Sequence, residues 1–464
     1  MYTRHLIFAV SILFIATVSF AQQKLNVLFI IADDLRPELG AYGVTAIKTP
    51  NIDMIAARGT RFDNAYAQWP VCNPSRASFL TGRYPTQTGV MNNNDYFRRK
   101  HPDFITLPQY FKQNGYASLR SGKIFHGGID DQVSWTEGGE PVDSNITERG
   151  NPYYRRARPQ RPADQGPRIN YSDRIVVLEG EGESHGDYKT ATKAIEYLDR
   201  YKDKPFFLAV GFVKPHSPPS APQKFFDWYD VDRIELPVDF DTVPRAPAGL
   251  PEISIASRNS DLFIGRPSPP NLSREMKRAY YASTSFMDAQ VGRVLEALKR
   301  NKLEENTIVV FFGDHGYHLG EKGKWSKAYS LYELGLRVPL IIAVPKGKAQ
   351  YSKQVVGLID LYKTLAELCR LPEPSDIEGN SLAPLIKDPN ASWDHPSLAL
   401  VEYRQKTGKS VRTKEWHYVE WDEGRAGAML FKHPDDPHEL KNLAGHPEYS
   451  NVVKEMKNLL KKVP

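Results

Sequence analysis

Short apolar runs rich in β-branched and aromatic residues alternate along the 464-residue chain with longer segments of helical periodicity. The clearest runs lie at 25–32, 205–212, 307–312 and 338–344. In 188–198 and 287–298, apolar residues instead return every three or four positions, which is typical of helices with one buried face. This alternation predicts an α/β fold built on a large mixed, mostly parallel sheet that is flanked by helices on both faces.

The pattern changes near residue 391. Strand-like pieces follow at 398–403 and 417–421, and a helical pattern begins at about Tyr449. We therefore expect a large α/β domain over residues 22–390 and a smaller C-terminal α+β domain over residues 391–464.

The N-terminus has the composition of an export signal. Arg4 and His5 precede an apolar run from Leu6 to Phe20, and the small residue Ala21 precedes a polar pair. The run is shorter than the ~20 residues of a spanning helix, and no later segment is apolar enough to span. We expect residues 1–21 to be a signal peptide, and the protein to be periplasmic or secreted without stable membrane insertion.

Charge narrows the classes of partner. The formal net charge is +6, with no long lysine run and no nucleic-acid-binding motif, so nucleic acid is not an expected partner. A mild positive excess suits a polyanionic substrate. Residues 149–168, rich in Arg, Pro and Gln, predict a solvated loop, with a basic flap over an anionic substrate as the alternative.

Polar residues follow three of the apolar runs directly. They are Asp33-Asp34, Asp314-His315 and Lys214-Pro215-His216. Because ligands of parallel sheets bind beyond the carboxyl ends of the strands, these side chains are expected to converge. Adjacent carboxylates repel each other unless a cation lies between them, and a hard divalent cation prefers oxygen ligands. The alternative for each aspartate is a helix N-cap.

The chain has two cysteines, Cys72 and Cys369, which we expect to remain unpaired. Cys369 ends an apolar helical pattern, where a buried thiol is ordinary. Cys72 instead opens the segment Cys72-Asn73-Pro74-Ser75-Arg76, which continues as Ala77-Ser78-Phe79-Leu80-Thr81-Gly82-Arg83.

This segment resembles the signature of the sulfatase family, Cys-x-Pro-Ser-Arg followed by Leu-Thr-Gly-Arg. The resemblance extends over nearly all of the chain after its N-terminus, and within the family it is strongest to iduronate-2-sulfatases, at residues 33–40, 122–126, 213–216 and 325–327. It implies an alkaline-phosphatase-like fold. It also implies that a maturation enzyme oxidises Cys72 to formylglycine, whose hydrate attacks the sulfur of a sulfate ester.

The same resemblance implies roles for the other candidate residues. Asp33, Asp34, Asp314 and His315 would hold one Ca²⁺ together with residue 72, although imidazole is an unusual calcium ligand. Arg76 and Lys123 would stabilise the formylglycine. His126 would assist release of sulfate from the enzyme. His216 and Lys327 would bind sulfate, with His216 as the acid. His318, Lys322 and Lys324 have no such support and are expected at the rim.

The expected activity is therefore hydrolysis of sulfate esters on a sulfated oligo- or polysaccharide, with a uronate 2-O-sulfate as the implied position. Glycosaminoglycans and algal polysaccharides such as ulvan both remain open as sources. Two alternatives remain: a phosphonate or phosphodiester hydrolase of the same superfamily, and a non-catalytic protein that binds sulfated glycans.

Overall fold

The computed structural model describes residues 24–142, 171–433 and 435–461. Its large sheet has the strand order β3-β5-β1-β7-β8-β2-β9. The strands are β1 (Asn26–Asp33), β2 (Thr60–Tyr66), β3 (Ala117–Gly122), β5 (Phe206–Pro215), β7 (Thr307–Gly313), β8 (Arg337–Ala343) and β9 (Gln350–Gly357). Strands β3, β5, β1 and β7 run parallel, whereas β8 is antiparallel to both of its neighbours. The predicted mixed, mostly parallel sheet is confirmed.

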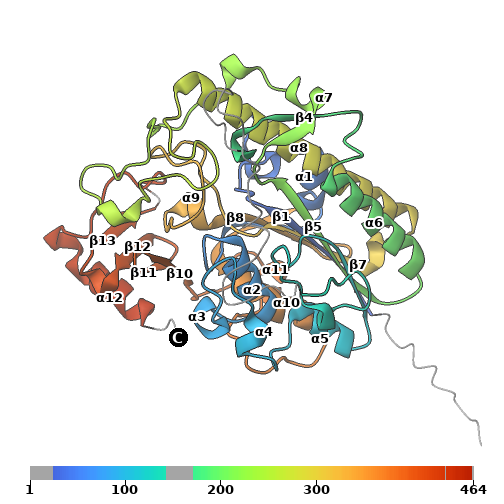
Figure 1. The fold of residues 1–464 in the computed structure, drawn as a ribbon. Helices are drawn as coiled ribbons and strands as arrows, with labels where there is room; N and C mark the ends of the chain where they lie inside the picture. The colour runs from blue at the N-terminus through green and yellow to red at the C-terminus, as the bar shows by residue number, and fades with distance from the viewer. Residues whose placement is uncertain (1–23, 143–170, 434, 462–464) are drawn as a thin grey trace, which may run out of the picture.

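Helices cover both faces of this sheet (Figure 1). Successive residues of β1 show why: Leu28 and Ile30 pack with one group of helices, whereas Phe29 and Ile31 pack with the other. The first face carries α1 (Pro50–Ala56), α6 (Gly186–Tyr201) and α8 (Pro270–Arg300), and the second carries α2 (Cys72–Thr81), α5 (Leu107–Gln113) and α10 (Leu361–Leu368). Both predicted helical segments lie within α6 and α8.

Shorter elements complete the large domain. The helices are α3 (Pro85–Thr88), α4 (Phe97–Lys100), α7 (Gln223–Phe226), α9 (Glu333–Leu336) and α11 (Ala383–Lys387). Strands β4 (Val176–Leu178) and β6 (Ser220–Pro222) form a separate two-stranded sheet.

The C-terminal part forms a second, antiparallel sheet in chain order. Its strands are β10 (Ser397–Tyr403), β11 (Lys406–Arg412), β12 (Trp416–Trp421) and β13 (Ala428–Lys432), followed by α12 (Ser450–Leu460). A separate apolar cluster lies beneath it and includes Tyr66 and Trp69 of the large domain. The predicted α+β character is confirmed, whereas the boundary at residue 391 stays a prediction.

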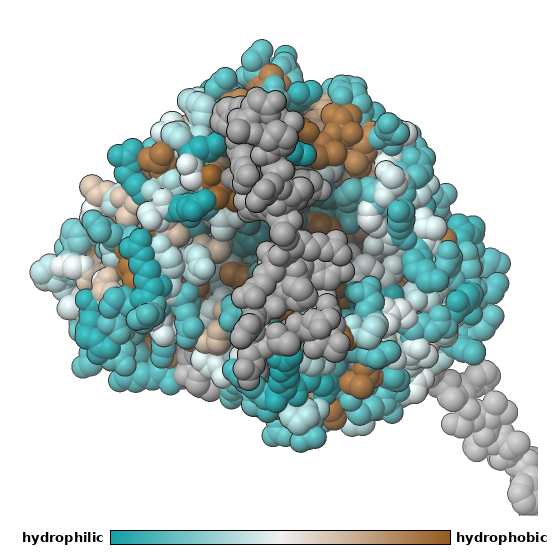
Figure 2. Space-filling model, in the orientation of Figure 1, coloured by the Kyte–Doolittle hydropathy of each residue, from teal (hydrophilic) through white to brown (hydrophobic). Residues whose placement is uncertain are grey.

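Among the residues that the structure describes, no helix is long and apolar enough to cross a membrane. The face shown in Figure 2 is mainly hydrophilic, with small, separated apolar patches. The proposed signal peptide at 1–21 and the proposed loop at 149–168 lie outside the described residues.

Candidate active site

Parallel strand ends bring the candidate residues together. Asp33 is the last residue of β1, and Asp314 directly follows β7, which is paired with β1 up to Ala32 and Gly313. Asp34 has a positive φ of 62°, an unfavourable conformation for a residue with a side chain. Its N–H donates to Asp314 Oδ1 (3.2 Å) and its carbonyl accepts from Tyr280 (2.8 Å). Neither Asp33 nor Asp34 is the N-cap of a helix.

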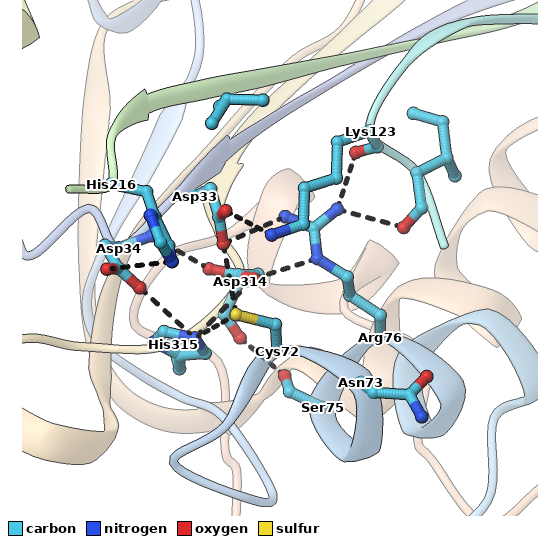
Figure 3. A network of polar contacts seen from close by, with 12 residues as sticks. Asp33, Asp34, Cys72, Asn73, Ser75, Arg76, Lys123, His216, Asp314 and His315 are labelled. Atoms are coloured by element: carbon cyan, nitrogen blue, oxygen red, sulfur yellow. Dashed lines mark hydrogen bonds and ion pairs between the residues drawn. The ribbon is translucent and has the colours of Figure 1, made fainter. Parts of the chain in front are cut away.

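Cys72 begins α2, and its side chain is buried against these carboxylates (Figure 3). Its Sγ lies 3.3 Å from Asp33 Oδ1 and 3.2 Å from His315 Nε2. Burial, and then the charge of Asp33, raise the pKa of the Cys72 thiol well above its usual range. The thiol is therefore protonated near neutral pH, which makes it a poor nucleophile. Both Cys72 and Cys369 are unpaired, as expected.

Two cations lie beside Asp33, the buried Arg76 and the partly exposed Lys123. Arg76 Nε donates to Asp314 Oδ2 (2.9 Å), and the Arg76 guanidinium also donates to the carbonyls of Lys123 (2.6 Å) and Ile124 (2.9 Å). Lys123 Nζ donates to Asp33 Oδ2. Burial alone would raise the pKa of Asp33, but Lys123, His216 and Arg76 together hold that pKa well below its usual range. Asp33 is therefore ionised.

Lys327 and His216 lie on the other side of the aspartates. Lys327 Nζ lies 2.9 Å from Asp34 and 3.3 Å from Asp261 Oδ2. His216 Nε2 is 3.9 Å from Asp34 Oδ2, and burial, followed by the charge of Lys327, lowers the pKa of His216 to about 3. Burial and the charge of Lys123 likewise lower the pKa of His126. Both histidines are therefore neutral at pH 7 before an anion enters.

The donor atoms suit a metal ion. One ligand atom from each of Asp33, Cys72, Asp314 and His315 lies within 4.8 Å of the others. Asp34 Oδ1 is buried and lies 2.9 Å from Lys327 Nζ and 3.5 Å from His315 Nε2, so a positive charge already lies beside this oxygen. We call Asp33, Asp34, Cys72, Asp314 and His315 the strand-end cluster. Three carboxylates favour a hard divalent cation.

A cavity of about 570 Å³ lies elsewhere on the C-terminal part, whereas the strand-end cluster opens into one of about 520 Å³. This site cavity is lined by Cys72, His126, His216 and Lys327, together with residues that the sequence did not indicate, including Trp69, Asp261, Tyr329 and Glu402. Asp261 lies in the irregular segment before α8 and Glu402 lies on β10, so neither follows a strand of the large sheet. No strand-end signal could have revealed them.

One expectation is wrong. His318, Lys322 and Lys324 do not line the rim; all three side chains are buried. Lys322 Nζ donates to Asp239 (2.7 Å) and Lys324 Nζ donates to the carbonyl of Ala328 (2.8 Å). These bonds replace hydration of the ammonium groups and allow their burial.

Comparison with known proteins agrees with this geometry. The family described as "Sulfatase" matches residues 25–370. This chain belongs to the sulfatase family. Residues 320–464 also match the family described as the C-terminal part of N-sulphoglucosamine sulphohydrolase. Family membership makes the protein a sulfuric ester hydrolase of a family whose members generally use a formylglycine and a metal ion.

Named relatives cover nearly the whole sulfatase. It is 36% identical to the iduronate 2-sulfatase of Homo sapiens, over 86% of this chain and 85% of that protein. It is 29% identical to the Delta 4,5-hexuronate-2-O-sulfatase of Bacteroides thetaiotaomicron, over 95% of this chain and 89% of that protein. The solved phosphonate monoester hydrolase of Agrobacterium radiobacter has a TM-score of 0.73 at 21% identity, over 95% of each chain, and shows that the fold is shared.

Proposed function

We propose that this sulfatase removes a uronate 2-O-sulfate from a sulfated oligo- or polysaccharide, using a formylglycine made from Cys72 and one bound Ca²⁺. The observation that carries the proposal is the position of Cys72, buried between Asp33 and His315 at the start of α2 and open to the cavity. The similarity to iduronate 2-sulfatase and to a hexuronate-2-O-sulfatase supports the sugar and the position.

In this proposal Asp33, Asp34, Asp314 and His315 hold Ca²⁺ beside residue 72. The ion would supply Lewis-acid stabilisation to the anionic oxygens of the site. Neutralising the carboxylates in this way leaves Arg76, Lys123 and Lys327 to attract an anion. The buried guanidinium of Arg76 also fixes the turn at Lys123 and Ile124, so it positions the lysine as well as supplying charge.

One hydroxyl of hydrated formylglycine, ionised by loss of its proton to solvent, would attack sulfur while the S–O bond to the sugar breaks. His216 would give a proton to the departing sugar oxygen, and His126 would accept the proton of the second hydroxyl as the aldehyde re-forms and sulfate leaves. The pKa of His216 is about 3 without a bound anion. A sulfate between His216 and Lys327 would offset the lysine's charge and raise that pKa, so substrate binding itself would prepare the acid.

The protein would also be exported and modified before it becomes active. Residues 1–21 would direct export, and a formylglycine-generating enzyme would act on Cys72 as a transient partner. Cys72 heads a helix that is buried throughout, so modification would take place before the chain folds.

The test is a panel of defined sulfated disaccharides, with free sulfate and the desulfated position as readouts. Protein with verified formylglycine should release sulfate from uronate 2-O-sulfates, and the matched variant Cys72→Ala should release none. An aryl phosphonate tests the alternative that the protein is a phosphonate or phosphodiester hydrolase. Hydrolysis of the phosphonate faster than every sulfate ester at saturating Ca²⁺ would contradict the proposal.

A further inference from the structure

The lining of the site cavity is divided by charge. Its described cationic or potentially cationic side chains are His126, His216 and Lys327, all of which belong to the sulfate-binding side. Lys327 pairs with Asp34 and Asp261, at 2.9 and 3.3 Å, and in the proposed function its charge binds the reacting sulfate. The remainder of the described lining therefore offers no free cation to a second sulfate.

Glu402 is the charged residue on that remaining wall. It lies near the end of β10, its side chain is exposed, and within the described ranges it has no ion-pair partner. A carboxylate only accepts hydrogen bonds, so Glu402 can bind hydroxyl groups but repels a sulfate placed beside it, and the carboxylate of a uronate substrate would point away from this wall. Arg404, nearby in sequence, does not line the cavity; its guanidinium lies 5.1 Å from the Tyr403 ring centroid.

An aromatic surface adjoins Glu402. The ring centroids of Tyr329 and Tyr403 are 4.7 Å apart at an angle of 32°, so the C-terminal sheet holds Tyr329 against the cavity. Tyr329 is 38% exposed and has a positive φ of 64°, a conformation that costs free energy for an aromatic residue. An exposed ring held in a strained backbone at a cavity wall can stack on the apolar face of a sugar.

We propose that Tyr329 and Glu402 form the sugar-binding wall of the site, with Tyr329 stacking on the ring and Glu402 accepting hydrogen bonds from its hydroxyl groups. The wall would select glycans that present free hydroxyls beside the reacting sulfate and disfavour those that carry a second sulfate there. This inference rests on the proposed function and deepens it, because it defines the sulfation pattern that the enzyme accepts.

The test compares two disaccharides that differ only by a second sulfate on the ring that carries the reacting one. Glu402→Lys should raise the ratio of kcat/KM for the disulfated over the monosulfated substrate by about tenfold, and Glu402→Gln by about threefold, because repulsion is replaced by attraction or removed. The preference of the unaltered enzyme should also weaken as salt rises. Glu415→Gln, an exposed carboxylate outside this cavity, is the matched control.

Tyr329 is tested by a conservative pair. Tyr329→Ala should raise KM for both disaccharides by about tenfold, and Tyr329→Phe should restore most of the loss, since stacking needs the ring. An unchanged ratio of kcat/KM for the disulfated over the monosulfated substrate in Glu402→Lys would contradict the proposed sugar-binding wall.

Binding measurements separate this inference from the proposed function. Saturation-transfer NMR follows both disaccharides on protein with Cys72→Ala, which requires no turnover. If the enzyme releases no sulfate while Glu402→Lys still reverses the binding preference, the proposed function fails and the wall stands. If the monosulfated and disulfated disaccharides bind equally to Cys72→Ala protein both with and without Glu402→Lys, the proposed sugar-binding wall is wrong.

Discussion

Two buried groups of carboxylates and histidines in this sulfatase look alike by composition but differ in what surrounds them. The first is the strand-end cluster. The second, which we call the C-terminal cluster, consists of Glu333, His417, His433 and Glu439, whose ligand atoms also lie within 4.8 Å of one another.

The C-terminal cluster is saturated by protein groups. Glu333 accepts from Tyr66 (2.9 Å) and from Arg412 Nε (3.3 Å), and Glu439 Oε2 accepts the backbone N–H of Glu333 (2.7 Å). His417 Nδ1 and His433 Nε2 contact the other oxygen of Glu439. Because Glu333 belongs to α9 and the remaining residues to the C-terminal part, this network joins the two parts of the molecule.

The strand-end cluster is also paired with a protein cation, since Lys327 Nζ lies 2.9 Å from Asp34 Oδ1, but its Cys72 opens into the site cavity. Buried charge alone therefore does not identify an active site in this protein. Access to a cavity of about 520 Å³ does, and this contrast predicts that substitutions in the first cluster change activity while those in the second change stability.

The largest expected effect is at Cys72. Cys72→Ala should reduce sulfate release by about 10⁴-fold or more, because the nucleophile is lost while the buried surroundings remain. The unfolding midpoint should change little, since the residue buries only a small side chain. Initial rates of sulfate release and thermal melts measure the two quantities. Substantial residual activity would show that another residue is the nucleophile.

Removing the metal is the next largest effect. Extensive chelation, or Asp314→Asn, should reduce activity by about 10³-fold, and Ca²⁺ should restore only the chelated wild-type enzyme. Ca²⁺ should also raise the melting temperature of the wild type and not of the variant, because binding to the folded state stabilises it. Full activity after chelation would refute a metal at the strand-end cluster.

In the C-terminal cluster, Glu439→Gln should lower the free energy of unfolding by about 3 kcal/mol, because it leaves His417 and His433 beside a neutral group at a buried site. Activity per folded molecule should be retained. Denaturant melts and active-site titration give the two values. Loss of activity with unchanged stability would remove the distinction between the clusters.

The smallest effect concerns pH. Burial would raise the pKa of Glu439, but His417 and His433 hold it well below its ordinary value of 4.5. A carboxyl whose pKa is lower in the folded state stabilises the protein above the unfolded-state pKa and loses that contribution as pH falls below about 4.5. The stability difference between wild type and Glu439→Gln should therefore shrink below pH 4.5. A constant difference from pH 7 to pH 3 would contradict the assignment.

The sequence predicted those parts of the fold and site whose position depends on a local pattern of apolar residues. Apolar runs marked the strands β1, β5, β7 and β8, and parallel pairing places their carboxyl ends together, so Asp33, Asp314 and the residues after β5 could be predicted to converge. Strands β2 and β9 carry many polar residues and gave no clear signal. Glu402 and Tyr329 line the same cavity only through packing of the C-terminal part on the large domain, which no local pattern encodes. The same limit explains Lys322, whose burial depends on the distant oxygen partners Asp239 and His438.

The most direct test of the central claim measures activity against the extent of modification at residue 72. Preparations with graded fractions of formylglycine, quantified by mass spectrometry of the Cys72 peptide, are assayed for sulfate release from one uronate 2-O-sulfated disaccharide at saturating Ca²⁺. We predict a rate proportional to that fraction, with none from fully unmodified thiol. Equal rates from thiol and formylglycine protein would contradict the account.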